Sequence, residues 1–472
     1  MKLRTALGFL VLASASLASA HGVHFGIVED SDANHYYRSS GISSFEVSYE
    51  GDIALSADRE SVASMAPGAS LEIRVRRLFT TRILRVTAGD AGKPQMRYWI
   101  GDRTGSAEAG RDFLARNLPE VARVTAVGAG AEARRLLALG PARLLDAVGG
   151  LENETAQEIY LEELRKSRPT DPAVGRRAVE VAAHEISSSR RLRRLLTDFA
   201  ETLPPDPAIT SALARACAEI SSSSQSAAAI VAIARVRGIS AASARDYGHA
   251  LREIGSSSEK STAIERLSPL ASDPASIEAL ADAAESIASS SETRRALEAL
   301  ARHPDLSAPT FARIISAGGK IASSSEKASL LVECAPAAAA SNEPRREYLA
   351  VARTIESSSE CRRALSALLR PGLPAEGVAP VLAAAKRIDS SSQKSELLVQ
   401  AAALPLDPAA FSAYMDCAAA IDSSSEKARA IRALLAGGTL SPEQRKRILD
   451  FAEREISSSS ERESVLHAAI AR

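Results

Sequence analysis

The sequence is poor in aromatic residues and carries no excess of charge of either sign. Phe, Trp and Tyr together make up 4% of its 472 residues, and 58 lysines and arginines balance 58 aspartates and glutamates. A neutral chain has no overall field that attracts nucleic acid, and few aromatic rings leave little surface on which bases can stack. The composition therefore predicts that nucleic acid is not a partner.

Long apolar runs are also absent, except at the N-terminus. Lys2 and Arg4 precede a short apolar segment from Ala6 to Leu17, and Ala18-Ser19-Ala20 has the small-residue pattern of a cleavage site. This arrangement is typical of a secretory signal peptide, which we assign to residues 1–20. No later segment offers the roughly 20 apolar residues that a membrane-spanning helix needs. We therefore expect an exported protein, periplasmic or extracellular, with no transmembrane segment after signal cleavage.

Cysteine is scarce as well: the chain has Cys217, Cys334, Cys361 and Cys417. An oxidising compartment favours disulfides. However, Cys334 lies near the end of its predicted helix and Cys361 near the start of another, a large offset against the Cα separation limit of about 7 Å. We expect free, buried cysteines that act as small apolar side chains.

What the chain has in abundance is a repeat. An aliphatic residue, in most copies followed by a serine-rich turn, returns at spacings of 33 to 35 residues. These anchors are Leu151, Ile186, Ile220, Ile254, Ile287, Ile321, Ile355, Ile388, Ile421 and Ile456. Periods of this size are typical of helix–turn–helix repeats, which bury their apolar faces only by stacking on one another. The sequence predicts a mainly α fold, with an α-solenoid of about ten repeats over residues 151–472.

Both helices of each repeat have recognisable starts. Several first helices begin with Asp or Ser followed by Pro, as at Asp407-Pro408 and Ser441-Pro442. At the second helix, serine is followed three residues later by Glu or Gln, which is the capping box. In that motif the hydroxyl accepts an N–H of the first turn and the carboxylate accepts the N–H of the cap residue. The predicted caps are Ser222, Ser256, Ser289, Ser323, Ser357, Ser390, Ser423 and Ser458.

Two copies depart from the capping pattern, and part of it has no explanation. The copy at Ile186 has Arg191 in the acidic position, and the first copy offers Asn153 in place of the serines. The additional serines of each turn are not needed for capping. A periodic row of hydroxyls would suit glycans or a repetitive polymer, but capping and solubility are the simpler interpretation.

The chain before the repeats has a different pattern. In residues 21–105, apolar residues alternate with polar ones, as at Phe45, Val47 and Tyr49, which predicts a small antiparallel β domain of four to six strands. Residues 106–150 have helical periodicity, and we expect them to adapt and cap the start of the array. Within them Gly128-x-Gly130-x-x-Ala133 has dinucleotide-binding spacing but is followed by helix alone, so we interpret it as a turn into a helix.

Several segments together resemble a bacterial family of exported proteins. They are Phe45 to Gly51 (FEVSYEG), Arg97 to Ile100 (RYWI), Gly128 to Arg134 (GAGAEAR) and the I-x-S-S-S-E-K array. Similar segments form the extracytoplasmic tail of membrane metallopeptidases of the β-lactam-sensor type. The peptidase's membrane helices and H-E-x-x-H zinc site have no counterpart here. The resemblance implies a scaffold, and a soluble regulator of an envelope sensor or peptidase as one alternative. The array is also similar in layout to HEAT-type repeats.

The densest basic cluster is the candidate interaction site. Arg190, Arg191, Arg193 and Arg194 alternate with leucines in one predicted helix, at the copy where the capping box fails. Such a cluster suits an anionic partner, such as a lipid headgroup or an acidic protein patch. A solvated helix face is the simpler interpretation.

Histidines supply the candidate metal site. Signal cleavage would leave His21 at the N-terminus with His24 close behind, and an amine with imidazoles suits copper. A third ligand is only a guess, at His35, so accidental placement is favoured. His184-Glu185 lacks the second histidine that a helical zinc site needs, since residue 188 is serine.

The functional expectation follows from the array. No catalytic, phosphate-binding or cofactor motif emerges from local spacing, so we expect neither an enzyme nor a bound cofactor. The sequence predicts an exported protein-interaction scaffold with a protein partner. A metal-binding protein or enzyme that uses the N-terminal histidines is a second alternative.

Overall fold

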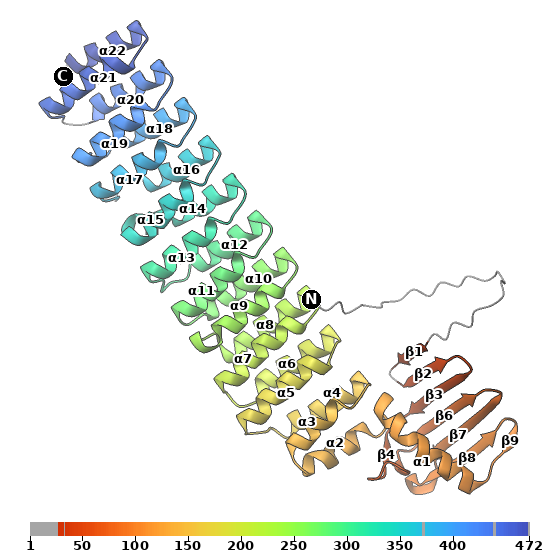
Figure 1. Ribbon diagram of the computed structural model, residues 1–472. Coiled ribbons are helices and arrows are strands. Elements are labelled where there is room, and N and C mark those ends of the chain that lie inside the picture. The colour runs from red at the N-terminus through yellow and green to blue at the C-terminus, as the bar shows by residue number, and fades with distance from the viewer. Residues whose placement is uncertain (1–26, 33, 371–372, 438–439, 471–472) are drawn as a thin grey trace, which may run out of the picture. The chain divides into compact units, whose positions relative to one another are not determined.

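The computed structural model describes residues 27–32, 34–370, 373–437 and 440–470 (Figure 1). The chain forms two units. The first runs to Leu136 and includes Gly150–Ile159, and the second comprises Leu137–Gly149 and the chain from Tyr160 onward. The predicted signal peptide, residues 1–20, lies outside the described residues.

Alternating apolar residues make the first unit an antiparallel β structure. Among the described residues, seven strands form one sheet in the order β1-β2-β3-β6-β7-β8-β9, and β4 pairs with β5 separately. The strands are β1 (Ile27–Asp32), β2 (His35–Ser40), β3 (Ser43–Glu50), β4 (Ile53–Leu55), β5 (Val62–Met65), β6 (Ser70–Arg77), β7 (Thr80–Ala88), β8 (Pro94–Ile100) and β9 (Arg103–Thr104), with a short 3-10 turn at Asp90–Gly92.

One face of this sheet forms the core of the unit together with helix α1 (Ala107–Val124). Val47, Ile73 and Leu84 lie opposite one another in the register of β3, β6 and β7 and are fully buried. Leu118 and Val121 of α1 pack into the same cluster. The period of two places every second residue on this face, which is why the sequence pattern identified these strands.

The first unit differs from its prediction in two respects. It has nine described strands instead of four to six, because β2 has no clear alternation and β4 and β5 are too short to show a period. The segment 106–150 is not a unit of its own, since α1 shares the core of the sheet whereas α3 (Pro141–Val148) belongs to the second unit. Helix α2 (Ala129–Ala138) follows Gly128, whose φ is 74°, so the predicted turn into a helix is confirmed.

The second unit is a serial array of paired helices, which confirms the predicted α-solenoid (Figure 1). First helices pack on first helices of neighbouring copies, as α9 does between α7 and α11, and second helices do the same. The first helices after α3 are α5 (Pro172–Glu185), α7 (Pro207–Ala216), α9 (Ala241–Glu253), α11 (Pro274–Ala284), α13 (Ala308–Gly318), α15 (Asn342–Ala352), α17 (Ala375–Ala385), α19 (Pro408–Ala419) and α21 (Pro442–Glu455).

The second helices form the other layer of the array. They are α6 (Ser189–Thr202), α8 (Ser223–Arg237), α10 (Ser257–Leu267), α12 (Ser290–Ala301), α14 (Ser324–Ala340), α16 (Ser358–Leu368), α18 (Ser391–Ala401), α20 (Ser424–Gly437) and α22 (Ser459–Ile470), with 3-10 turns at Cys217–Glu219 and Ser268–Leu270. Helix α4 (Glu154–Lys166) precedes them and is divided between the two units after Ile159. The four cysteines are free and buried, as expected. Burial raises the pKa of the Cys361 thiol to about 11, so it stays protonated at neutral pH.

The predicted first-helix starts are confirmed. Asp206 accepts from two N–H groups in the first turn of α7, and Ser441 forms a complete capping box with Gln444 at α21. The side chains of Asp171, Asp273 and Asp407 cap α5, α11 and α19 in the same way. These local motifs fix where each first helix begins.

Serine also caps the second helices, at seven of the eight predicted positions. At distances of 3.4 or 3.5 Å, the N–H three residues on is accepted by the hydroxyls of Ser256, Ser289, Ser323, Ser357, Ser390, Ser423 and Ser458. The prediction for Ser222 is wrong, because its hydroxyl makes no cap bond and instead lies 3.3 Å from that of Ser224. These cap bonds are long, so each contributes little by itself.

The carboxylate half of the capping box is not formed as predicted. The N–H of the cap serine donates instead to a serine of the preceding copy, as Ser256 does to Ser223 Oγ and Ser323 to Ser290 Oγ, both at 3.2 Å. The same bond joins Ser222 to Ser189, Ser390 to Ser358, and Ser423 to Ser391. The second serine of a turn therefore ties that turn to the next copy.

The third serine completes this chain of hydroxyls. In each turn its Oγ lies 2.9 to 3.3 Å from that of the cap serine, as Ser325 does from Ser323. The cap hydroxyl thus takes part both in the cap bond and in the bond to the third serine, and hydrogen bonds that share a hydroxyl strengthen one another. We call this chain of cap, second and third serines the serine ladder. It explains the serines that capping alone left unexplained.

The Glu or Gln of the turn accepts a hydrogen bond from an arginine of the preceding copy. Arg294 Nε donates to Glu326 Oε2 at 2.5 Å, and Arg362 Nε donates to Gln393 Oε1 at 2.6 Å. Arg432 binds Glu461 in an equivalent way. Because a guanidinium is a stronger donor than a backbone N–H, it draws these acceptors away from the predicted cap contact.

The lysine that ends the motif is buried, a role that sequence analysis missed. Lys260, Lys327, Lys394 and Lys427 are between 4% and 8% exposed. Each Nζ donates to the residue just before the next anchor, as Lys327 does to Thr354 Oγ1 at 2.9 Å and Lys394 to the Ala420 carbonyl at 2.5 Å. An ammonium group there satisfies free carbonyls and complements the helix dipole. The buried lysine is therefore a third hydrogen-bonded link between neighbouring copies, after those made by the serines and the arginines.

Candidate functional site

The first-helix layer of the array contains a groove between α15 and α17. Its volume is about 220 Å³. The lining residues are Asn342, Arg345, Arg346, Leu349, Arg353, Glu376, Gly377 and Pro380. Three arginines against one glutamate make the surface locally positive, although the chain as a whole is neutral. We call this hollow the arginine groove.

Arg345 is the central residue of the arginine groove. Only 5% of it is exposed, and its Nη2 donates to Asn342 Oδ1 at 2.7 Å. Its Nε is buried without a hydrogen-bond partner among the described residues. A buried guanidinium with an unmet donor is unfavourable unless an acceptor is supplied. A carboxylate or phosphate entering the groove is the acceptor that matches its planar donors.

The start of α17 shapes the other wall. Gly377 lets the guanidinium lie against the helix, because a Cβ at this position would overlap Arg345 Nη1. The N-cap is Pro374, which forms no side-chain cap bond, whereas the side chains of Asp171 and Asp407 cap their helices. The positive end of the helix dipole at α17 therefore has no capping side chain, although Glu376 in the first turn of the helix offsets part of its charge.

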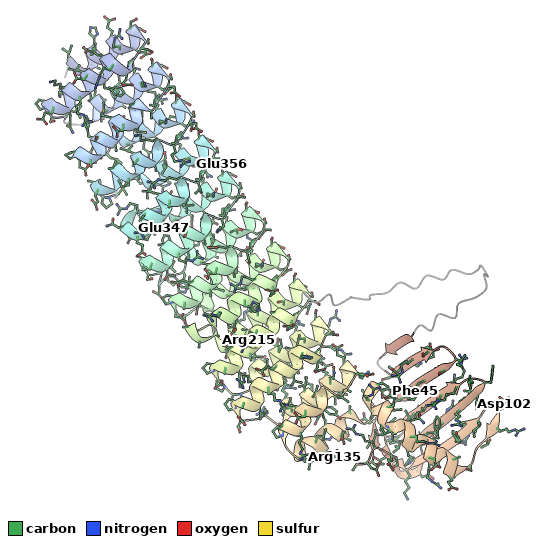
Figure 2. All side chains as sticks on the ribbon, viewed as in Figure 1. Phe45, Asp102, Arg135, Arg215, Glu347 and Glu356 are labelled. Atoms are coloured by element: carbon green, nitrogen blue, oxygen red, sulfur yellow. The ribbon has the colours of Figure 1, made fainter. Side chains whose placement is uncertain are left out.

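Two further arginines flank the arginine groove, Arg346 on α15 and Arg353 at its C-cap. Arg346 and Arg353 are both exposed, and Arg346 lies 3.5 Å from Glu347, an exposed ion pair that contributes little. Figure 2 labels Glu347 on α15 and, on the opposite edge of the array, Glu356 before α16. The groove therefore belongs to the first-helix layer, away from the serine turns.

The predicted basic cluster on α6 is only partly exposed to solvent. Arg190 and Arg194 are exposed, whereas Arg191 and Arg193 are half-buried. Arg193 Nε donates to Gln225 Oε1 at 2.6 Å, the same tie between copies that Arg294 makes to Glu326. Arg193 therefore helps to hold two neighbouring copies together. None of the four arginines of the cluster lines the arginine groove.

Of the candidate metal ligands, only His35 lies in the described part of the chain. His21 and His24 lie outside the described residues. His35 Nε2 lies 3.3 Å from Glu46 Oε1, across the β2–β3 pair. Among residues 27–32, 34–370, 373–437 and 440–470, no group of three or more His, Cys, Asp and Glu side chains is placed to hold a metal ion.

The sequence feature that marks the arginine groove is the missing capping residue before α17. The other first helices from α5 to α21 follow an Asp or a Ser, whereas α17 follows Pro374, and its start reads Leu373-Pro374-Ala375-Glu376-Gly377. Capping logic alone marks this copy as different, but the pairing with Arg345 requires the stacked geometry.

Comparisons with protein-family models, curated proteins and solved structures gave no match to this chain. In the described part of the chain, no helix combines the length and apolar character needed to cross a membrane.

Proposed function

We propose that the protein is an exported interaction scaffold and that its helical array binds a protein partner through the arginine groove. The observation that carries this proposal is the buried Arg345, whose Nε lacks an acceptor in a groove with two further arginines. The chemistry that fits is a carboxylate of the partner, from an acidic side chain or a chain terminus.

Stacked repeats support a binding role because they provide an extended rigid surface. Each copy contacts its neighbours, and the serine ladder, the arginine ties and the buried lysines hold successive turns in register. A rigid surface loses little conformational entropy when it binds, so more of the contact energy appears as affinity. Export is part of the proposal and rests on residues 1–20.

The class of partner follows from the resemblance in sequence. The segments from Phe45 to Gly51 and Arg97 to Ile100, together with the array, resemble the extracytoplasmic tails of β-lactam-sensor metallopeptidases. An envelope sensor or peptidase that the scaffold regulates in trans is therefore the first partner class to examine. This step rests on analogy alone.

The test is capture of the partner from the envelope fraction of the native cell, followed by affinity measurements. Arg345→Met keeps much of the side-chain volume and removes the charge, so we expect the affinity to fall about tenfold or more. Arg266→Met is the matched control, because Arg266 is exposed on α10 and outside the groove. Equal affinities of the two variants would remove the arginine groove from the proposal.

A further inference from the structure

Large exposed apolar side chains gather at one end of the β sheet in the first unit. Phe79 is completely exposed, and Leu78, Ile42 and Ile100 are 61%, 54% and 41% exposed. Leu78 and Phe79 form the β6–β7 turn, Ile42 lies in the β2–β3 turn, and Ile100 ends β8. We call these four residues the apolar tip.

Backbone hydrogen bonds hold the three turns next to one another. Leu78 N–H donates to the Ile42 carbonyl at 3.1 Å, and Gly101 N–H donates to the Thr81 carbonyl at 2.8 Å. The register agrees, since Ser43 pairs with Arg77 and Arg82 pairs with Ile100. The apolar tip is therefore one surface and not a set of scattered side chains.

The β6–β7 turn is unusual for a hairpin in water. Its first residue, Leu78, has a φ of 53°, in the left-handed region where glycine and asparagine are favoured. A leucine in that conformation is less stable than a glycine, and an exposed Phe79 adds nothing to the core. The sequence thus places two large apolar residues where folding favours small or polar ones.

Arginines surround the apolar tip. Arg76, Arg77, Arg82 and Arg103 are all exposed at this end of the sheet, and Asp102 in the β8–β9 turn is the nearby acid (Figure 2). Behind the turns lies a hollow of about 610 Å³ lined by Arg76, Arg77, Phe45 and Val75, and by Arg38, which is paired with Glu120 at 2.6 Å. This end of the sheet is therefore apolar at its turns and positively charged around them.

We propose that the apolar tip inserts into the surface of a membrane that contains anionic lipids, with the arginines binding lipid phosphates. Apolar side chains enter the boundary between headgroups and acyl chains, while flanking cations stay at the phosphate level. The separate protruding turns suit a fluid lipid surface, which closes around each side chain. The positive charge selects anionic over neutral lipid.

The test is flotation of the purified chain, starting at residue 21, with vesicles. Vesicles of phosphatidylcholine with phosphatidylglycerol should bind the protein, and binding should weaken with salt and be much lower on phosphatidylcholine alone. Phe79→Asp should lower the vesicle partition coefficient tenfold or more. Val236→Asp should leave it unchanged, because Val236 is an exposed apolar residue of the array.

A second variant separates membrane binding from folding. Leu78→Gly relieves the left-handed backbone of the turn, so it should raise the unfolding midpoint while it weakens vesicle binding. Failure of the wild-type chain to bind anionic vesicles, or equal loss in Phe79→Asp and Val236→Asp, overturns the proposal. It is also overturned if Phe79→Asp abolishes capture of a protein partner and leaves vesicle binding intact.

Discussion

At the residue scale, three buried tyrosines at comparable positions in first helices show how individual donors are satisfied. Tyr348 Oη donates to the Ala364 carbonyl at 2.7 Å, and Tyr414 Oη donates to the Ala430 carbonyl at 2.8 Å. Tyr247 is equally buried, but its Oη has no partner among the described residues. The same side chain thus occurs with and without its hydrogen bond.

The difference between Tyr348 and Tyr247 predicts different effects of the same substitution, Tyr to Phe. Tyr348→Phe should lower the free energy of unfolding by about 1 kcal/mol, because it leaves the Ala364 carbonyl without this donor. Tyr247→Phe should be neutral or stabilising, since it removes a buried hydroxyl that has no partner. Denaturant unfolding of both variants measures the difference. Equal destabilisation would show that the hydroxyl of Tyr348 contributes nothing beyond packing.

At the element scale, the turns show what a single sequence predicts and what it does not. The caps at Asp206, Ser256 and Ser441 were predictable because capping depends on residues two or three positions apart. The bond from Ser256 N–H to Ser223 was not, because it joins residues that become neighbours only when the copies stack. The arginine groove escaped prediction for the same reason.

The serine ladder can be tested at one bond. Ser290→Ala removes the acceptor of the Ser323 N–H, so we expect a loss of about 1 kcal/mol in the free energy of unfolding. Ser316→Ala on α13 is the control, because Ser316 is exposed on a helix surface and alanine favours helix there. If both variants have the same stability as the wild type, the serines between copies are not stabilising.

The buried lysines predict a pH dependence. Burial lowers the pKa of Lys327 below its ordinary value of 10.5 in the folded protein. Between the folded and unfolded pKa values the unfolded chain binds more protons, so this lysine makes the free energy of unfolding rise with pH. Relative to Lys327→Met, the wild type should therefore gain stability as pH rises toward about 10.5. Unfolding of both proteins across this range measures the difference, and a constant difference would contradict the shift.

The molecule as a whole has no net charge, yet it carries two basic surfaces. The chain balances 58 basic with 58 acidic residues, yet both the arginine groove and the end of the sheet at Arg76, Arg77 and Arg82 are locally positive. The composition predicted that the chain has no overall electrostatic field. It did not predict these two locally positive surfaces, because the position of each charge depends on the fold. The repeat period, in contrast, predicted the array, since stacking is the only way such helices bury their apolar faces.

Binding of the partner through the arginine groove can be tested with a pair of substitutions that add bulk inside and outside the groove. Gly377→Leu adds bulk against Arg345 in the groove without changing any charge, and Ala350→Leu adds one carbon less at an exposed position of α15 outside the lining. We expect Gly377→Leu to lose the envelope partner and Ala350→Leu to retain wild-type affinity, with both proteins folded by circular dichroism. Full binding by a folded Gly377→Leu variant would show that the partner does not bind through the arginine groove.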